Sequence, residues 1–178
     1  MFHFSKNAYS RKHQGQRGFT LVEILIVMMI IGVLTTIVGG NYVAAKAKSR
    51  DAKRKNDASQ LQRALEAHIS DFGTYPTDVN GTIHAFGTTT LAWGDPFIDP
   101  NTNVIYMTLL PNDVQAPAKQ YRYEANSTGT EYQIFLYLEN ENDVQINSDV
   151  EARGLSCGNV TCNFGLSSSN TTLTEVLN

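Results

Sequence analysis

Residues 19–39 read FTLVEILIVMMIIGVLTTIVG, and this stretch decides how the chain is organised. Its only charged residue is Glu23, and about 20 apolar residues in a helix are enough to cross the hydrocarbon core of a bilayer. A cleaved secretory signal also combines a basic start with an apolar run, but its apolar part is not expected to begin with a carboxylate. The stretch therefore predicts a single membrane-spanning helix.

The helical pattern continues past Gly39 and Gly40 in a different form. Beyond them, apolar residues recur at spacings of three and four, which is typical of a helix with one buried face; these residues are Ala58, Leu61, Leu65, Ile69 and Phe72. A helix over residues 19–72 would be about 80 Å long at ~1.5 Å per residue, too long for one compact domain to enclose. Since glycine weakens a helix by about 1 kcal/mol relative to alanine, we expect a bend or local break at Gly39 and Gly40.

Turn-forming residues end the helical pattern. Residues 71–76 read DFGTYP, where Gly73 suits a helix terminus and Pro76 cannot continue a helix. From residue 77 to residue 118 the sequence contains turn signals without a clear period. This part predicts a long loop with one short helix or strand near residues 104–110.

Strand patterns follow the loop. Residues 120–125 (QYRYEA) alternate tyrosines with polar groups, and residues 131–138 (EYQIFLYL) are rich in aromatic and β-branched side chains. Residues 126–129 between them predict a hairpin connection. We expect a third strand at residues 144–150 and a polar tail at residues 167–172. The patterns predict an α+β fold, in which a long N-terminal helix with a membrane half and an amphipathic half packs on a small antiparallel sheet.

Charge is distributed very unevenly. Residues 1–18 carry four Lys or Arg and no acid, and without them the chain has 10 Lys and Arg against 17 Asp and Glu, net −7. Residues 41–63 hold seven cations and two acids, whereas residues 64–178 hold 14 acids and three cations, net −11. The six cations of residues 46–55 are either a solvated helix face or a surface that meets acidic bodies of neighbouring subunits or anionic lipid headgroups. An acidic body repels phosphate, so we expect no nucleic-acid partner.

A recognisable motif spans the start of the apolar stretch. Residues 17–23 read RGFTLVE, which resembles the processing site of type IV pilins and of the pseudopilins of type II secretion, and the resemblance covers residues 12–76. It implies that a prepilin peptidase cuts after Gly18 on the cytoplasmic side and methylates the new amino group of Phe19. The positive-inside rule alone does not fix this orientation, because six cations follow the apolar stretch and only four precede it. The orientation is therefore taken from the motif.

Glu23 can be interpreted on physical grounds as well. A carboxylate within an apolar membrane helix costs at least ~2.5 kcal/mol and calls for a partner. After cleavage, the amine of Phe19 in a neighbouring, axially shifted chain could reach it. Such a pair would neutralise two desolvated charges and fix the stagger between subunits, and the family resemblance implies the same assembly role. The alternative is a carboxylate at the membrane interface without a partner.

The resemblance also implies a division of the chain and a set of partners. Many pilins have a proline at the position of Gly40, where their filaments melt the helix, and Gly39 with Gly40 supplies a similar softness. The expected partners are identical or related pilin subunits, the prepilin peptidase, the inner-membrane assembly platform and membrane lipid. The expected segments are a basic leader (1–18), the transmembrane and polymerisation half of the helix (19–39), its amphipathic half (40–72), an αβ loop (73–118), and a β-sheet with a C-terminal loop (119–178).

Three functions fit this reading. The first is a structural subunit of a type IV pilus-like filament, and the alternative is the major pseudopilin of a type II secretion system, to which residues 75–77 and 110–113 are also similar. A further alternative is a membrane-anchored binding or adhesin domain whose helix is only an anchor. We expect no enzyme, because the sequence lacks a serine elbow, an HExxH motif, a phosphate loop and a CxxC pair. The subunit would cross the cell membrane once, leader in the cytoplasm and body outside, before entering an extracellular or periplasmic filament.

Two weaker signals lie in the carboxy-terminal part. Cys157 and Cys162 predict a disulfide on an exported body, with two free thiols as the alternative. Glu139, Glu141 and Asp143 are candidate calcium ligands, because oxygen-rich loops bind calcium and some major pseudopilins hold it in their carboxy-terminal loops. A solvated acidic turn is the alternative at these positions. No other metal and no cofactor is expected.

Overall fold

The computed structural model describes residues 18–87 and 89–177, without the side chains of residues 37–41. Apart from Gly18, the predicted leader, residues 1–18, therefore lies outside the described residues. The chain forms two compact units, Met1–Tyr42 and Val43–Asn178.

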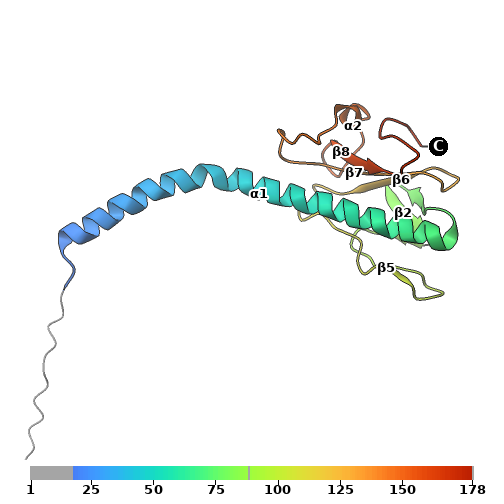
Figure 1. Ribbon diagram of the computed structural model, residues 1–178, viewed down its shortest axis with the longest axis horizontal. Coiled ribbons are helices and arrows are strands. Elements are labelled where there is room, and N and C mark those ends of the chain that lie inside the picture. Colours follow the sequence, from blue (N-terminus) through green and yellow to red (C-terminus); the bar gives the residue numbers. More distant parts are fainter. Residues whose placement is uncertain (1–17, 88, 178) are drawn as a thin grey trace, which may run out of the picture. The chain divides into compact units, whose positions relative to one another are not determined.

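One long helix, α1, spans Leu21–Phe72 and contains 52 residues (Figure 1), which confirms the predicted long N-terminal helix. It ends at Gly73, whose φ of 77° is the left-handed conformation that glycine adopts readily after a helix. The N–H of Gly73 donates to the carbonyl of Ile69 at 2.7 Å, which satisfies one of the last helical carbonyls. Of the bend or local break expected at Gly39 and Gly40, the local break is absent from the single chain, because the backbone of α1 is helical through both residues.

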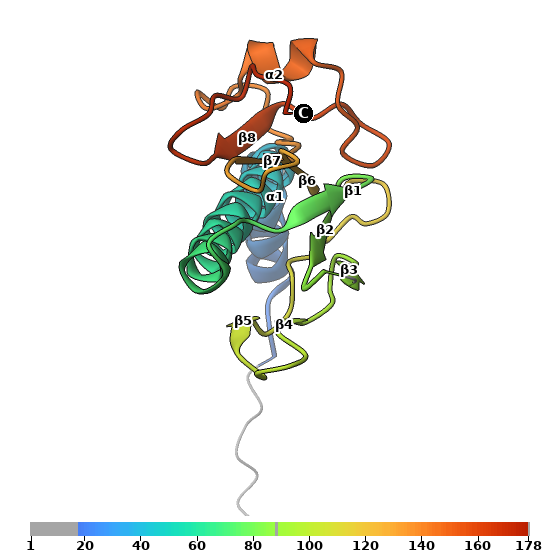
Figure 2. The ribbon, with the colours of Figure 1, turned by 90° about the vertical axis from the view of Figure 1, so that its right-hand side faces the viewer.

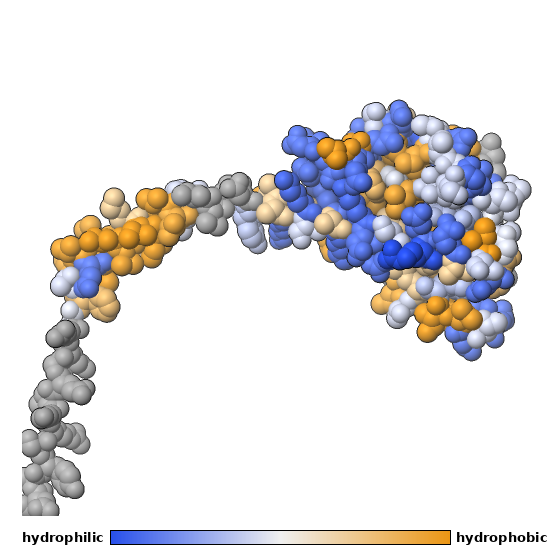
Figure 3. All heavy atoms as spheres, in the orientation of Figure 1, coloured by the Kyte–Doolittle hydropathy of each residue, from blue (hydrophilic) through white to orange (hydrophobic). Residues whose placement is uncertain are grey.

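The first unit carries the apolar half of α1. All described side chains from Phe19 to Thr36 are exposed, and Figure 3 shows this segment as a nearly continuous apolar surface. The last three residues of the predicted membrane segment (19–39) are among those whose side chains the structure does not describe. None of the helices formed by the described residues has an apolar stretch long enough to span a membrane.

The second unit contains three small antiparallel sheets and a short helix beside the second half of α1 (Figures 1 and 2). The first sheet has the order β1-β2-β3, with β1 at Thr77–Val79, β2 at Thr82–Ala85 and β3 at Thr89–Leu91. The second pairs β4 (Phe97–Ile98) with β5 (Ile105–Met107). The third has the order β6-β7-β8, with β6 at Arg122–Ala125, β7 at Tyr132–Leu136 and β8 at Phe164–Ser167. Short helix α2 spans Ser148–Ala152. The predicted α+β class is confirmed.

The main core lies between α1 and the sheets. The buried stripe of α1 consists of Ala58, Leu61, Ala64 and Leu65, all within one core cluster with the β-strands. A fully buried leucine contributes about 2 kcal/mol through the hydrophobic effect, so Leu61 and Leu65 hold the sheets on this half of the helix.

Strand β7 is the centre of the third sheet, and all five of its residues are buried. Since side chains alternate along a strand, Ile134 and Leu136 join the α1 cluster while Phe135 joins a second cluster. That second cluster contains Val150 of α2 and both cysteines. Strand β7 therefore connects the helix side of the body to the carboxy-terminal loops.

Several local predictions need correction. The strand expected at residues 144–150 is wrong, because Asn147 caps the start of α2 by accepting a hydrogen bond from the N–H of Asp149 at 2.9 Å. The third strand is β8, which includes the first residue of the predicted polar tail. Strand β5 lies where one short helix or strand was predicted, near residues 104–110, but the rest of the loop predicted at residues 73–118 also contains the four short strands β1–β4. The hairpin between β6 and β7 is present, with Ala125 opposite Tyr132.

Candidate functional site: the start of α1 and its attachment to the body

The predicted cleavage position lies in the exposed chain just before α1. Gly18 and Phe19 are both exposed, and 82 % of the surface of Phe19 is accessible. A Cβ added to Gly18 would meet nothing within 4 Å, and this residue does not adopt a positive φ. The described chain therefore makes no steric demand for glycine at this position.

Thr20 and Glu23 form a capping box at the start of α1. The N–H of Thr20 donates to Oε2 of Glu23 at 3.1 Å, and the N–H of Glu23 donates to the Thr20 hydroxyl at 3.2 Å. The Thr20 hydroxyl in turn donates to Oε2 at 3.2 Å. Two backbone N–H groups that the helix leaves unpaired are thus satisfied reciprocally. A threonine three residues before a glutamate is the local sequence signature of this arrangement, which the prediction for Glu23 did not include.

The capping box orients the carboxylate that is expected to act in assembly. Both hydrogen bonds that Thr20 donates go to Oε2 of Glu23, whereas Oε1 has no hydrogen bond within the described chain. The carboxylate also lies at the positive end of the helix dipole. One oxygen therefore holds the helix start, and the other is available to a cation from outside the chain.

The basic stretch of α1 attaches the helix to the body. The side chain of Arg54 is 2 % exposed and donates to both carboxylate oxygens of Asp113, from Nε at 2.5 Å and from Nη2 at 3.1 Å. Its Nη1 donates to Asp51 at 2.9 Å and to Glu139 at 2.7 Å, and its Nη2 also donates to Gln115 at 2.8 Å. Bidentate pairs of this kind are stronger and more directional than single charge contacts.

Neighbouring side chains extend this network to the loop after β7. Arg50 donates to both oxygens of Glu139, at 2.7 Å and 2.5 Å, and this contact is the main reason that the pKa of Glu139 is lowered to about 2. Asp51 accepts the backbone N–H groups of Glu139 and Asn140 at 2.8–3.0 Å. The hydrogen bond from Lys55, 2.7 Å long, lowers the pKa of Asp143.

This network corrects the predictions made for the six cations of residues 46–55. Arg50, Lys53, Arg54 and Lys55 form ion pairs with acids of their own chain, although half of the Lys53 side chain stays exposed. Three of the six cations, Arg50, Arg54 and Lys55, are therefore bound to the body instead of forming a solvated face. The remaining two cations, Lys46 and Lys48, are exposed and form no ion pair with any described residue.

The same contacts occupy two of the three candidate calcium ligands. Glu139 and Asp143 are bound by arginine and lysine side chains, while Glu141 is exposed. Within the part of the chain that the structure describes, no group of three His, Cys, Asp or Glu residues is placed to hold a metal ion. The acidic loop is therefore fixed by cations of the protein.

A disulfide closes the carboxy-terminal loop. Cys157 and Cys162 are bonded, with their Cα atoms 5.1 Å apart, and both are fully buried against Phe135 and Val150. The bond lies beside the second core cluster, far in sequence from the start of α1. It belongs to the body and takes no part in the amino-terminal site.

Comparison with known proteins identifies the amino-terminal segment. Residues 13–39 match the family model described as the prokaryotic N-terminal methylation motif. The type II secretion system core protein G of Pectobacterium carotovorum is 37 % identical over 76 residues, which are 43 % of this chain and 49 % of that protein. The protein of the same name in Escherichia coli K12 is 42 % identical over 66 residues, 37 % of this chain and 46 % of that protein.

A pilin is also among the relatives. The type IV major pilin protein PilA of Myxococcus xanthus is 34 % identical over 71 residues, 40 % of this chain and 32 % of that protein. The matches to core protein G span about half the length of those relatives, and no solved structure matches the chain. Over its amino-terminal segment, the chain is similar to type II secretion core protein G and to the type IV pilin PilA, and it carries the prokaryotic N-terminal methylation motif.

Proposed function

We propose that this protein is the structural subunit of a filament, cut after Gly18, methylated at Phe19 and assembled through the apolar half of α1. The observation that carries the proposal is the methylation motif at residues 13–39, followed by a helix whose apolar side chains are exposed from Phe19 to Thr36. An apolar surface of this length needs a cover. In the proposal lipid covers it first, and the same surface of other subunits covers it in the filament.

The capping box suits the assembly step. After cleavage, the only new cation of each chain is the amine of Phe19. In a bundle of axially shifted helices, this amine would approach the free Oε1 of Glu23 in a neighbour while Oε2 stays on Thr20. The charge pair would be made only at the correct stagger, so it would select that stagger during assembly.

We place the filament of a type II secretion system first. The relatives named core protein G support this choice, since the two compared above share 37 % and 42 % of the aligned residues, against 34 % for the pilin PilA. A type IV pilus subunit is the second candidate, supported by PilA. In both cases the chain acts as a substrate of the prepilin peptidase and of an assembly platform in the membrane, and performs no chemistry itself.

The processing step is tested by mass spectrometry of the mature amino terminus. We expect a chain that begins at Phe19 and carries one methyl group when the full chain is expressed with its peptidase. Gly18→Ala should leave the leader attached. Gly32→Ala is the matched control, because a Cβ at either glycine meets nothing within 4 Å, and this variant should be processed normally. An intact leader in the native protein would contradict the proposal.

A gene deletion separates the candidate functions. Loss of protein export without loss of surface fibres would support the secretion filament, whereas loss of shear-released fibres containing this protein would support the pilus. If the protein is a membrane-anchored adhesin, it should be a monomer, and Glu23→Ala should not change its oligomeric state. Chemical cross-linking tests this. Ladders of cross-linked native chains that disappear in Glu23→Ala would exclude the adhesin.

A further inference from the structure

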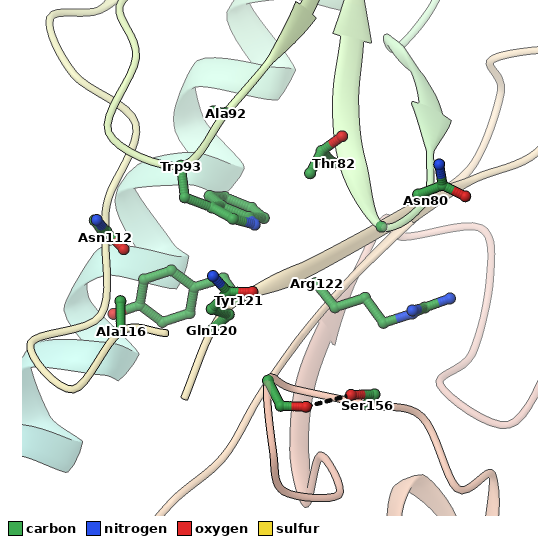
Figure 4. Close-up of a pocket in the computed structure, with 12 residues that line it drawn as sticks. Asn80, Thr82, Ala92, Trp93, Asn112, Ala116, Gln120, Tyr121, Arg122 and Ser156 are labelled. Carbon is green, nitrogen blue, oxygen red and sulfur yellow. Dashed lines mark hydrogen bonds between the residues drawn. The ribbon is translucent and has the colours of Figure 1, made fainter. Parts of the chain in front are cut away.

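A cleft of about 400 Å³ opens on the body between the β1–β2 turn, the end of β3 and the loop that the disulfide closes (Figure 4). Its volume is within the range of roughly 300–1,000 Å³ that is typical of small-molecule sites. The lining combines two aromatic rings, three carboxamides and one guanidinium, from Trp93, Tyr121, Asn80, Asn112, Gln120 and Arg122. The filament function proposed above uses none of these side chains.

The aromatic rings form a fixed wall of the cleft. Trp93 and Tyr121 meet edge to face, with ring centroids 5.6 Å apart and an angle of 75° between the planes. Tyr121 is buried, and its hydroxyl donates to Asp57 of α1 at 2.8 Å, so it is held from behind. Trp93 is half-buried and lies beside Tyr121 in Figure 4. The indole is therefore supported on one side and accessible on the other.

The carboxamides give the cleft its polar character. Within the described chain, the side-chain amides of Asn80, Asn112 and Gln120 form no hydrogen bond. Each amide offers two N–H donors and a carbonyl acceptor, so together they suit a ligand that both donates and accepts. Arg122 is the only charged side chain of the lining, and its Nε donates to Glu124 at 2.9 Å, a carboxylate that also accepts from Nη2 of Arg153 at 2.8 Å.

Two glycines shape the walls. Gly81 has a φ of 81°, and a Cβ there would lie 3.1 Å from Cγ of Arg122. Gly158 has a φ of 82°, and a Cβ there would lie 2.7 Å from the carbonyl oxygen of Ala118. Neither position accommodates another side chain without strain. At these two positions the backbone itself sets the wall of the cleft.

We propose that this cleft binds neutral sugar units of a glycan. A sugar ring has an apolar C–H face that packs on an aromatic ring, and hydroxyl groups that each donate and accept hydrogen bonds. The half-buried indole and the three free carboxamides match these two properties. An apolar ligand would bury these amides without partners, which is costly.

Trp93 makes the proposal directly measurable, because it is the only tryptophan of the chain. The full chain in detergent micelles is titrated with chitohexaose and with cellohexaose while tryptophan emission is recorded. We expect a saturable change in emission with at least one of these sugars. Asn112→Ala and Gln120→Ala should each weaken binding by about tenfold, which corresponds to the loss of one hydrogen bond of ~1.4 kcal/mol.

The control variant is Gln145→Ala, which removes an exposed carboxamide of the same body outside the cleft and should leave binding unchanged. Thermal unfolding of each variant verifies that it is folded. The absence of a saturable emission change with both sugars would overturn the proposal. Calorimetry gives a second test, in which the heat of sugar binding is measured for each variant. If neither Asn112→Ala nor Gln120→Ala reduces this heat, the sugar binds elsewhere and the proposal is overturned. A saturable emission change with an unstructured peptide, while both sugars give none, would identify a polypeptide ligand and also overturn it.

Discussion

The guanidinium of Arg54 and the carboxylate of Asp113 form two hydrogen bonds, although 59 residues separate them in the sequence. Both side chains are at most 3 % exposed. A buried charge is tolerated only when it is paired and hydrogen-bonded, and here Asp51, Glu139 and Gln115 complete the contacts of Arg54. This pair therefore joins the helix to the loop before β6, and its partners join the helix to the loop after β7.

Arg54→Met should destabilise the body strongly. Removal of one partner leaves the carboxylate of Asp113 buried without its counter-charge, which typically costs about 3–5 kcal/mol. The free energy of unfolding, measured by denaturant titration of the full chain in micelles, checks this. Lys53→Ala is the control on the same helix, because its ion pair with Asp57 is 3.8 Å long and half of the Lys53 side chain is exposed. We expect a loss of no more than about 1 kcal/mol there, and equal losses in the two variants would contradict the role of Arg54.

Acid should weaken the same network through Glu139. The hydrogen bonds from Arg50 are the main cause that lowers its pKa from 4.5 to about 2. Because the pKa is lower in the folded state, the stabilisation is complete above a pH of about 4.5 and is lost as the pH falls from there towards about 2. Unfolding free energies measured across this interval should decrease for the native chain.

Glu139→Gln should flatten that decrease, because the amide does not titrate. Glu141→Gln is the matched control: this neighbouring acid is exposed and forms no ion pair with any described residue, so its pH profile should follow that of the native chain. Equal flattening in both variants would show that the acid sensitivity has another source.

Chelation of divalent cations should not change the stability of the body. Glu139 and Asp143 are already neutralised by Arg50 and Lys55, with contacts of 2.5–2.7 Å. A calcium ion would have to displace these cations before it reached the carboxylates. We expect the same Tm with EDTA and with added calcium, and a Tm that rises with calcium would contradict the assignment of these carboxylates to ion pairs.

The sequence predicted those parts of the fold that depend on local pattern. The spacing of apolar residues located Ala58, Leu61 and Leu65 of the buried stripe of α1, although Phe72 of the same pattern is exposed. Alternation located β6, and aromatic and β-branched content located β7. Strand β8 was missed because Phe164–Ser167 is short and contains a glycine, so its place depends on pairing with β7 rather than on its own propensity. The segment that contains helix α2 was predicted as a strand because of its β-branched residues. The cap from Asn147 outweighs them and starts a helix instead.

The ion network could not be read from the sequence in the same way. Arg54 and Glu139 are 85 residues apart, and only the folded chain brings them together. The net charge of each segment indicates a basic stretch and an acidic body. These net charges do not show that cations of the basic stretch pair with acids of the body within one chain. The capping box is the opposite case. Thr20 and Glu23 are three residues apart, so their contact could have been predicted from the sequence alone.

The two proposed tasks of Glu23, capping and assembly, can be separated by substitution. Thr20→Val keeps the charge of Glu23 but removes the hydroxyl that accepts its N–H, which should cost about 1 kcal/mol of helix-start stability. Amide hydrogen exchange at Glu23 should then become about fivefold faster. Thr20→Ser, which retains the hydroxyl, is the control and should exchange at the native rate.

Glu23→Gln tests the other task. A glutamine side chain still accepts the hydrogen bond from the Thr20 N–H, since Gln replaces Glu in capping boxes, but it carries no charge for the amine of a neighbour. We expect native protection of the Thr20 amide together with loss of cross-linked ladders in the membrane. If the ladders persist in Glu23→Gln and disappear in Thr20→Val, assembly depends on the order of the helix start and the proposed charge pair is wrong.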